Sequence, residues 1–252
     1  MSEPHGLQQL LRSLSNDAAT KLAEISNRRD EGEREGQYGL DLVIDNPLVE
    51  SLLENGLGVL SEEAGVISPD RELLAVVDPV DGSTNASRLL PWYATSICIF
   101  DDQGPFVSLV ENLATRERFE AIRGGGALHN GQPMEPVESV AAGERIVLVN
   151  GTAPNKGPWA QYRCLGASAL DISYVAAGKV DGYVDFDDEA HGVWDYAGAL
   201  LVCTEVGAVI GDAFGRDLVH RDHTARRTPV VAHDQGAFDE FLEIRRQLGE
   251  NP

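Results

Sequence analysis

The sequence predicts a layered α/β fold, in which helices cover mixed sheets, and three observations support this prediction. Patterns typical of helices and of strands are mixed along the 252 residues. Several predicted strands follow one another across turns without a crossover helix, which disfavours a strict doubly wound sheet. The chain is 42% apolar and long enough to bury a sizeable core, but it is too short for many domains, so we expect one compact unit.

The first half of the chain opens with a predicted helix at residues 7–28, where apolar side chains recur at helical spacing. Residues 28–39 are charged and glycine-containing and lack this periodicity, which is typical of a loop. We expect a second helix at 47–55 to begin with Pro47, because proline fits the first helical position. Strands are predicted at 56–61, 73–77, 93–100, 105–111 and 117–122.

The second half begins after predicted turns at 124–126 and 129–131. The stretch 135–144 is acidic and rich in small residues, which indicates a boundary between an N-terminal lobe, residues 1–140, and a C-terminal lobe, residues 141–252. The C-terminal lobe is predicted to contain strands at 145–150, 180–186 and 228–232 and helices at 166–177, 195–206 and 237–248.

The charge balance is strongly acidic: 41 Asp and Glu against 20 Lys and Arg give a formal charge of −21. Such a surface repels nucleic acid and anionic membranes, whose binding depends on basic side chains. An excess of acid with only three lysines is typical of a salt-rich cytoplasm, such as that of a halophilic archaeon. Acidity for solubility alone is the other interpretation.

The cysteines and the N-terminal segment indicate a cytoplasmic protein. Cys98, Cys164 and Cys203 stand singly in apolar surroundings without any CxxC, which is typical of buried thiols in a reducing compartment. The opening MSEPHGLQQL lacks the basic and apolar regions of a secretory leader, and no apolar run approaches the length of a membrane span.

The most informative stretch, residues 78–85, reads DPVDGSTN. An apolar strand runs straight into Asp78, so this residue and Asp81 stand at a turn. Gly82 lets the backbone approach a ligand closely, and the following hydroxyls and N–H groups can meet an anion. Hard cations such as Mg²⁺ take oxygen ligands, so a cation could join these carboxylates to a phosphate. For DxxDG alone, an ordinary surface turn is the alternative.

The full string matches the pattern D-P-x-D-G-[ST]-x-N, and two further segments occur in the matching order. They are Ser61-Glu62-Glu63 upstream and Trp194-Asp195-Tyr196 downstream. With Arg123–Ala127 and Gly166–Ala169, the chain resembles the inositol monophosphatase and fructose-1,6-bisphosphatase superfamily of Mg²⁺-dependent, lithium-sensitive-type phosphatases over nearly its whole length. The resemblance implies the α-β-α-β-α sandwich of the sugar phosphatases.

The resemblance also implies a site for two or three Mg²⁺ ions. The implied ligands are the side chains of Glu62, Asp78, Asp81 and Asp195 and the backbone carbonyl of Val80. Two metal ions can bind the attacking and leaving oxygens of an in-line displacement, with a metal-activated water as the nucleophile. Four carboxylates in one cleft would also repel one another unless cations neutralised them.

The implied catalytic residues are Ser83, Asp45 and Glu63. Ser83 takes the place of a family Thr or Ser that orients the water, with Asp45 as its acidic partner. Asp41 is the competitor for that role, because the segment before Asp45 is shorter than in many relatives. Glu63 would support the ligands or contact a metal itself. For Asp41 and Asp45, a surface carboxylate at the end of an element is the alternative.

The implied substrate contacts fall into three groups. The phosphate would be held by backbone N–H groups of Gly82, Ser83 and Thr84. The segment Gly166, Ala167 and Ser168 would touch the alcohol portion, and Asp188 would grip its hydroxyls. A solvated acidic loop is an equally good reading of residues 185–189.

The sequence departs from the family pattern at two places. Ala86 stands where an aromatic residue often follows the motif asparagine, and the loop before Asp41 contains no lysine, for which Arg34 could substitute. The second departure leaves the number of metal ions open.

The resemblance implies hydrolysis of a small polyol or sugar phosphate, namely myo-inositol 1-phosphate, fructose 1,6-bisphosphate or both, by a protein whose relatives are commonly homodimers. A 3′(2′),5′-bisphosphate nucleotidase or a dinucleotide phosphatase is the alternative, although the sequence carries no mark of an adenine pocket. A catalytically silent binding protein on the same fold is disfavoured, because all four side-chain ligands are present.

Overall fold

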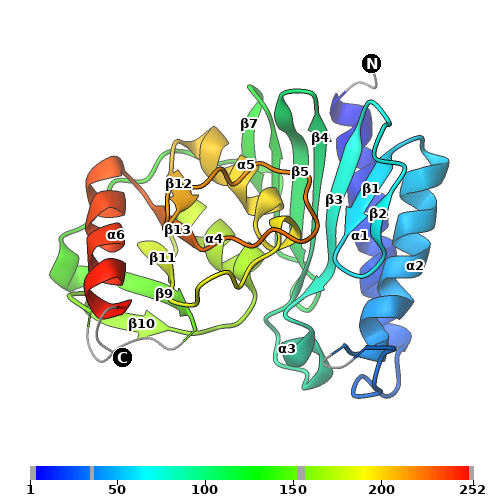
Figure 1. Cartoon of the computed structure of the whole chain (residues 1–252), viewed down its shortest axis with the longest axis horizontal. Coiled ribbons are helices and arrows are strands. Elements are labelled where there is room, and N and C mark those ends of the chain that lie inside the picture. The colour runs from blue at the N-terminus through cyan, green and yellow to red at the C-terminus, as the bar shows by residue number, and fades with distance from the viewer. Residues whose placement is uncertain (1–3, 35–36, 152–156, 250–252) are drawn as a thin grey trace.

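Five layers make up the protein, as Figure 1 shows for the computed structural model, which describes residues 4–34, 37–151 and 157–249. The layers are α1 (Pro4–Glu24) with α2 (Gly39–Glu54), an eight-stranded sheet, α4 (Ser168–Ala176) with α5 (Ala197–Val206), a five-stranded sheet, and α6 (Gln235–Gly249). The predicted α-β-α-β-α sandwich is therefore confirmed.

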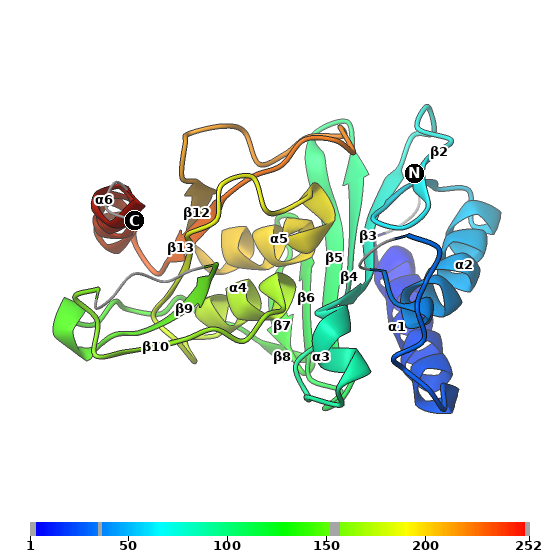
Figure 2. The same ribbon diagram turned by 60° about the horizontal axis from the view of Figure 1, so that its bottom comes forward.

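The eight-stranded sheet has the order β2-β1-β3-β4-β5-β6-β7-β8. Its strands are β1 (Gly58–Ser61), β2 (Gly65–Ile67), β3 (Leu74–Asp81), β4 (Ala94–Asp101), β5 (Gly104–Asn112), β6 (Arg118–Ile122), β7 (Gly126–His129) and β8 (Gln132–Pro133). β1 and β3 are parallel, and the other neighbours are antiparallel. Every residue of β3 is buried, because helices cover both faces of the sheet (Figure 2).

The five-stranded sheet has the order β10-β9-β11-β13-β12. Its strands are β9 (Ile146–Asn150), β10 (Gln161–Arg163), β11 (Gly182–Asp185), β12 (Val209–Asp212) and β13 (Pro229–Ala232). The first sheet ends at Pro133 and the second begins at Ile146, with the short 3₁₀ helix η1 (Ala142–Glu144) between them. α4 and α5 are almost entirely buried, because they fill the space between the two sheets.

The prediction that the second helix begins at Pro47 is wrong. α2 begins at Gly39, and Pro47 lies inside it. An internal proline removes a backbone hydrogen bond and disfavours a helix. Two features compensate: the Asp41 side chain accepts the backbone N–H of Tyr38 at 3.1 Å in the first turn, and one face of the helix is anchored in the core. The anchoring side chains are Leu40, Ile44, Leu48 and Leu52.

The sequence patterns did not predict β2, β7, β8, β10 and β12. Each has only two to four residues, and alternation over so few positions cannot be told from a loop. The predicted turn at 129–131 does exist, but it joins β7 to β8 as a hairpin, with Asn130 and Gly131 both at positive φ.

The cysteine prediction is correct at two of three positions. Cys98 and Cys203 are buried, whereas Cys164 is exposed beside β10. Within the described residues, no helix is both long and apolar enough to cross a membrane.

Candidate metal and phosphate site

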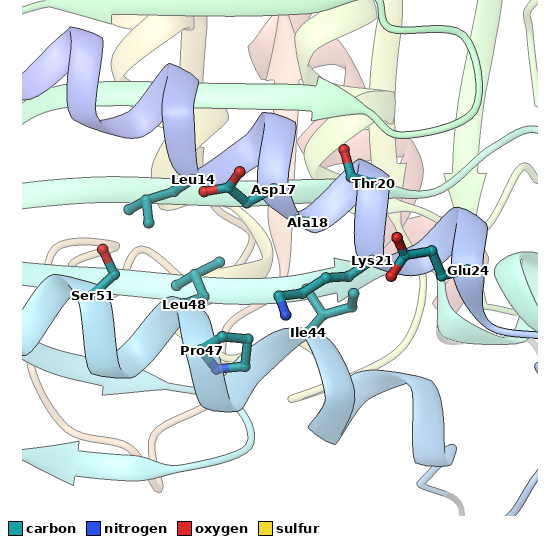
Figure 3. Close-up of a pocket in the computed structure, with 10 residues that line it drawn as sticks. All are labelled: Leu14, Asp17, Ala18, Thr20, Lys21, Glu24, Ile44, Pro47, Leu48 and Ser51. Carbon is teal, nitrogen blue, oxygen red and sulfur yellow. The ribbon is translucent and has the colours of Figure 1, made fainter.

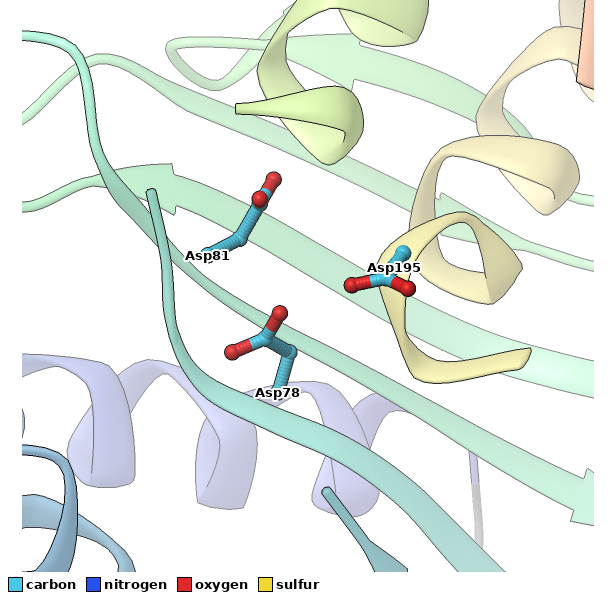
Figure 4. Close-up of side chains that lie close together, drawn as sticks. All are labelled: Asp78, Asp81 and Asp195. Atoms are coloured by element: carbon cyan, nitrogen blue, oxygen red, sulfur yellow. The ribbon is translucent and has the colours of Figure 1, made fainter. Parts of the chain in front are cut away.

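Three of the predicted ligands lie together between the eight-stranded sheet and α5. Asp78 and Asp81 come from the end of β3, and Asp195 comes from the 3₁₀ helix η2 (Val193–Asp195), 114 residues further along the chain. Figure 4 shows the three carboxylates pointing toward a common space. One oxygen of each lies within 4.8 Å of the others, which is the spacing expected around a shared cation.

A bulge in β3 explains why Asp78 and Asp81 face the same side. In a regular strand, residues three apart point to opposite faces of the sheet. Here Asp78 pairs with Ser96 of β4 and Asp81 pairs with Ala94, so β3 has one extra residue between them. The extra residue reverses the alternation and turns both carboxylates toward Asp195. The Thr95 hydroxyl stabilises the bulge by donating to the Pro79 carbonyl at 2.8 Å.

Asp195 is held by contacts on its own segment. Its carboxylate accepts the backbone N–H of Gly192 at 2.7 Å and lies 3.6 Å from Nδ1 of His191. The preceding residue, Trp194, is tied to the central sheet, because its carbonyl accepts the Ser96 hydroxyl at 3.3 Å. The ligand from the C-terminal half is therefore fixed against the strand that pairs with β3.

The carboxylates of this cluster are held in an environment that disfavours their charge. Burial raises the pKa of Asp78 well above its usual range, and the charges of Glu62, Asp81 and Asp195 raise it further. Burial and Asp195 raise the pKa of Asp81 to about 7, although the N–H of Ala169 opposes the rise. Burial, Asp195 and Glu63 also raise the pKa of Glu62, the fourth predicted side-chain ligand. A bound cation would offset this repulsion, so the donor set fits a hard metal ion.

The turn after β3 approaches the neighbouring backbone closely. Gly82 has a φ of +86°, and a β-carbon there would lie 3.0 Å from the carbonyl oxygens of Gly166 and Trp92. The short helix α3 (Ser83–Ser87) follows, with its first helical bond from Ala86 N–H to Gly82 C=O. The N–H groups of residues 82–84 precede that bond and are not used within the helix. The Val80 carbonyl, the predicted backbone ligand, accepts the Ser83 hydroxyl at 3.0 Å.

Asp41 and Asp45 lie one turn apart on the same buried face of α2, but their partners differ. The Asp45 carboxylate accepts the Ser61 hydroxyl at 2.5 Å, and that hydroxyl also accepts the N–H of Glu63. Asp41 instead borders the same cavity as Ser83. Burial raises the pKa of Asp41 to about 7, and the Ser83 hydroxyl offsets part of the rise. The structure thus brings the competitor Asp41 to Ser83 and sets Asp45 behind the Glu62–Glu63 turn.

Asp41, Ser83 and the Glu62–Glu63 turn border a cleft of about 330 Å³. Its lining residues are Arg34, Gln37, Asp41, Glu62, Glu63, Ser83, Trp194, His223 and Arg226. Arg34 and Gln37, both in the loop before α2, donate to the Glu63 carboxylate. His223 and Arg226 come from the connection between β12 and β13. Sequence reasoning missed both, because nothing in a charged loop indicates where it docks.

A second hollow lies between α1 and α2, away from the carboxylates (Figure 3). Its floor is apolar, with Leu14, Ile44 and Leu48, and Asp17, Lys21 and Glu24 stand at its rim. This groove holds no convergent set of catalytic groups.

The predicted substrate segment at 166–168 leads into the start of α4, where the next residue, Ala169, contacts the carboxylate cluster. The backbone N–H of Ala169 donates to the Asp81 carboxylate at 2.6 Å. The Ser168 hydroxyl is buried among the Tyr183 hydroxyl, at 3.2 Å, and the ring of His191. This segment therefore touches the residues that hold the cluster.

Asp188 does not line the cleft. Its carboxylate is exposed and pairs with Arg245 of α6, whose Nε is anchored on the Asp185 carbonyl at 2.8 Å. The register of the acidic run at 185–189 places Asp188 on the outer side of its loop, within reach of that guanidinium.

His191 is a buried residue of the site that the sequence reasoning did not select. Burial alone would lower its pKa, but hydrogen bonds to Asp185 and Asp195 outweigh burial and raise the pKa to about 10. These contacts favour the positively charged form of His191 directly beside a predicted ligand. The one sequence feature that could have indicated its role is its position four residues before Asp195, a predicted metal ligand.

Comparisons with known proteins agree with this geometry. A family model described as the inositol monophosphatase family matches residues 18–250. A Pyrococcus furiosus protein named fructose-1,6-bisphosphatase is 31% identical over 229 residues, which cover 86% of this chain and 84% of the relative. A Methanocaldococcus jannaschii fructose-1,6-bisphosphatase/inositol-1-monophosphatase is 29% identical over 213 residues, 81% of this chain and 82% of the relative.

Two further matches extend the comparison. The Escherichia coli Nus factor SuhB is 30% identical over 174 residues, 62% of this chain and 63% of the relative. Among solved structures, a Pyrococcus horikoshii protein described as having similarities to inositol-1 monophosphatase has a TM-score of 0.87 at 23% identity, covering 96% of this chain and 98% of that chain. At this identity the structural match supports the fold.

Proposed function

Because the chain belongs to the inositol monophosphatase family and is a phosphatase of that family, we propose that it hydrolyses a small polyol or sugar phosphate in a Mg²⁺-dependent reaction. The proposed substrates are myo-inositol 1-phosphate, fructose 1,6-bisphosphate or both. The observation that carries the proposal is the convergence of Asp78, Asp81 and Asp195, all with an oxygen within 4.8 Å of the others. Three carboxylates at this spacing can bind a cation that also coordinates a phosphate oxygen.

We assign the metal ligands to Glu62, Asp78, Asp81 and Asp195 with the Val80 carbonyl, for two or three Mg²⁺ ions. When bound, Mg²⁺ would neutralise phosphate charge and activate a water molecule for in-line attack. The raised pKa values of Glu62, Asp78 and Asp81 support this assignment, because charged carboxylates so crowded need a compensating cation.

The remaining proposed roles belong to the turn after β3 and to α2. The backbone N–H groups of Gly82, Ser83 and Thr84 precede the first hydrogen bond of α3 and would hold the phosphate. The Ser83 hydroxyl orients the attacking water. Of its two possible acidic partners, the contacts favour Asp41, whereas Asp45 supports the turn that carries Glu62 and Glu63. Gly166–Ser168 remains the proposed contact to the alcohol portion, whereas Asp188 is not kept in this role, because it pairs with Arg245 outside the cleft.

Two alternatives remain. A 3′(2′),5′-bisphosphate nucleotidase would need a surface on which adenine can stack, but the Trp194 ring at the cleft is buried and already packs against the His223 ring at 4.7 Å and the Arg226 guanidinium at 5.0 Å. A catalytically silent binding protein is favoured by the likeness to the Nus factor SuhB and disfavoured by the convergence of Asp78, Asp81 and Asp195.

The experiment is phosphate release in molar KCl, with and without Mg²⁺, from myo-inositol 1-phosphate, fructose 1,6-bisphosphate and 3′-phosphoadenosine 5′-phosphate. We expect Mg²⁺-dependent release from at least one of the first two. Release from the nucleotide alone would select the nucleotidase. No release from any of the three, with Mg²⁺ binding retained, would support the silent protein.

The oligomeric state and the cellular location are also proposed. We expect a homodimer, as in many relatives, which sedimentation analysis would test. We also expect a cytoplasmic location, which fractionation of the source cells would test.

A further inference from the structure

The connection between β12 and β13, residues 213–228, concentrates positive charge in an acidic protein. We call it the β12–β13 strap. It contains four of the chain's 20 basic residues and two histidines but only two aspartates, in a chain of net charge −21. In Figures 1 and 2 it leaves the five-stranded sheet, reaches the eight-stranded sheet near β3 and β4, and returns. The strap therefore brings basic side chains toward the cleft.

Three of the four arginines of the strap are engaged outside the cleft. Arg216 pairs with Asp212 at 2.9 Å, Arg221 donates to the Asp101 carbonyl at 2.6 Å, and Arg227 donates to the Asp217 carbonyl at 2.7 Å. These contacts hold the strap in place and leave one arginine, Arg226, at the cleft.

Arg226 is held in the cleft wall without a carboxylate partner among the described residues. Its guanidinium carbon lies 5.0 Å from the centre of the Trp194 ring. Nη1 donates to the carbonyls of His223 at 2.8 Å and Ala225 at 3.1 Å. One side of the guanidinium is thus fixed by the strap itself, and its other N–H groups have no partner in the described part of the chain. An arginine held in this way can bind a phosphate with a two-pronged hydrogen bond.

His223 fixes the strap against the end of β1, next to Glu62. Its Nε2 donates to the Ser61 carbonyl at 3.0 Å, one residue before Glu62, and its ring lies 4.7 Å from the Trp194 ring. His223 and Arg226 border the same cavity as Ser83 and Glu62. The other arginine at the cleft, Arg34, is already paired with Glu63. Arg226 is therefore the cationic group of the cleft that is available to a ligand.

We propose that Arg226 binds a second phosphate of the substrate, distinct from the phosphate that is hydrolysed at the carboxylate cluster. The inference rests on the proposed phosphatase function and narrows it to a preference for sugar bisphosphates over monophosphates. The cations proposed for the carboxylate cluster would balance the charge of the reacting phosphate. A second phosphate in the same acidic cleft needs a cation of its own, and Arg226 supplies it.

The test compares fructose 1,6-bisphosphate with myo-inositol 1-phosphate in the Mg²⁺-loaded protein. Arg226→Gln should lower kcat/KM for the bisphosphate about 10- to 100-fold, through KM, the factor expected for lost charge-assisted hydrogen bonds. The monophosphate should keep its wild-type kinetics. Arg226→Lys should fall between, because it keeps the charge and loses the planar fork. Arg163→Gln is the matched control, since Arg163 is an exposed arginine whose hydrogen bonds stay within its own strand, β10.

A binding measurement separates failure of this inference from failure of the proposed function. Calorimetric titration with fructose 6-phosphate, which retains only the second phosphate, does not require turnover. We expect Arg226→Gln to weaken this binding by the same factor and Arg163→Gln to leave it unchanged. Equal affinity of wild type and Arg226→Gln would overturn the inference even in an active enzyme. An equal loss for both phosphate esters would also overturn it, since Arg226 would then serve the reacting phosphate.

Discussion

The Asp81 carboxylate accepts the backbone N–H of Ala169 at 2.6 Å, across 88 residues of sequence. This bond joins the end of β3 to the first turn of α4, so the eight-stranded sheet and the helices that fill the space between the sheets meet at a proposed metal ligand. The geometry of the ligand set therefore depends on how the two halves of the chain pack. Moving α4 would move Asp81.

Asp81→Asn tests the ligand assignment with little change in packing, since the amide oxygen can still accept the Ala169 N–H. We expect phosphate release to fall roughly 10²- to 10³-fold, because a ligand charge worth several kcal/mol is lost. In Mg²⁺-free buffer the variant should melt at a higher temperature than wild type, because repulsion with Asp195 is relieved. Asp70→Asn, on an exposed loop, is the control. Near-normal turnover in Asp81→Asn would contradict the assignment.

The metal-free protein should lose stability as the pH rises. The pKa of Asp81 is about 7 in the folded chain, against about 3.9 for an unfolded aspartate, so the folded state binds more protons between these values. The free energy of unfolding should therefore be highest near pH 4 and fall as the pH approaches 7. His191 should add a second decline between about pH 6.5 and about pH 10.

Urea unfolding at a series of pH values measures this profile. Saturating Mg²⁺ should flatten the decline between pH 4 and 7, because the metal binds the charged carboxylates of the folded state. A free energy of unfolding that rises from pH 4 to 7 without metal would mean that the carboxylates are stabilised by partners within the chain, which would remove the argument for a cation.

That Asp78, Asp81 and Asp195 belong together could be predicted from sequence, because they stand in short segments of unusual composition. DPVDGSTN places two carboxylates beside a glycine turn, and Trp194-Asp195 lies in a similarly recognisable segment. The bulge that turns Asp78 and Asp81 to one side could not be predicted, because it depends on the register of β4 against β3. Alternation patterns describe single strands and carry no information on their partners.

The remaining differences between prediction and structure come from contacts between distant residues. Asp188 lies outside the cleft because Arg245, 57 residues later, pairs with it. His223 lies at the cleft because its side chain donates a hydrogen bond to the Ser61 carbonyl, 162 residues earlier in the chain. The early start of α2 has the same origin, since packing of its apolar face outweighs the cost of Pro47. This early start also moves Asp41 into the cleft.

Asp41→Asn and Asp45→Asn form a matched pair that decides which acid works with Ser83. We expect Asp41→Asn to lower kcat roughly 100-fold or more, the effect of losing a positioned base, with little change in melting temperature. Asp45→Asn should keep most of the activity, because its amide oxygen can still accept the Ser61 hydroxyl. Measuring kcat at saturating Mg²⁺ separates the two variants. The reverse ranking would restore Asp45 to the role that the family resemblance implies.

The formal charge of −21 should make the fold dependent on salt. Self-repulsion among surface carboxylates destabilises the compact state at low ionic strength, and salt shortens its range from roughly 30 Å at 0.01 M to about 3 Å at 1 M. We therefore expect the melting temperature to rise steadily from low to molar KCl. The double variant Asp70→Lys/Glu138→Lys changes two exposed acids to bases, moving the charge from −21 to −17, since each change adds two. It should melt higher at low salt and gain less from KCl. A melting temperature that falls with KCl would contradict adaptation to high salt, and acidity for solubility would then be the remaining interpretation.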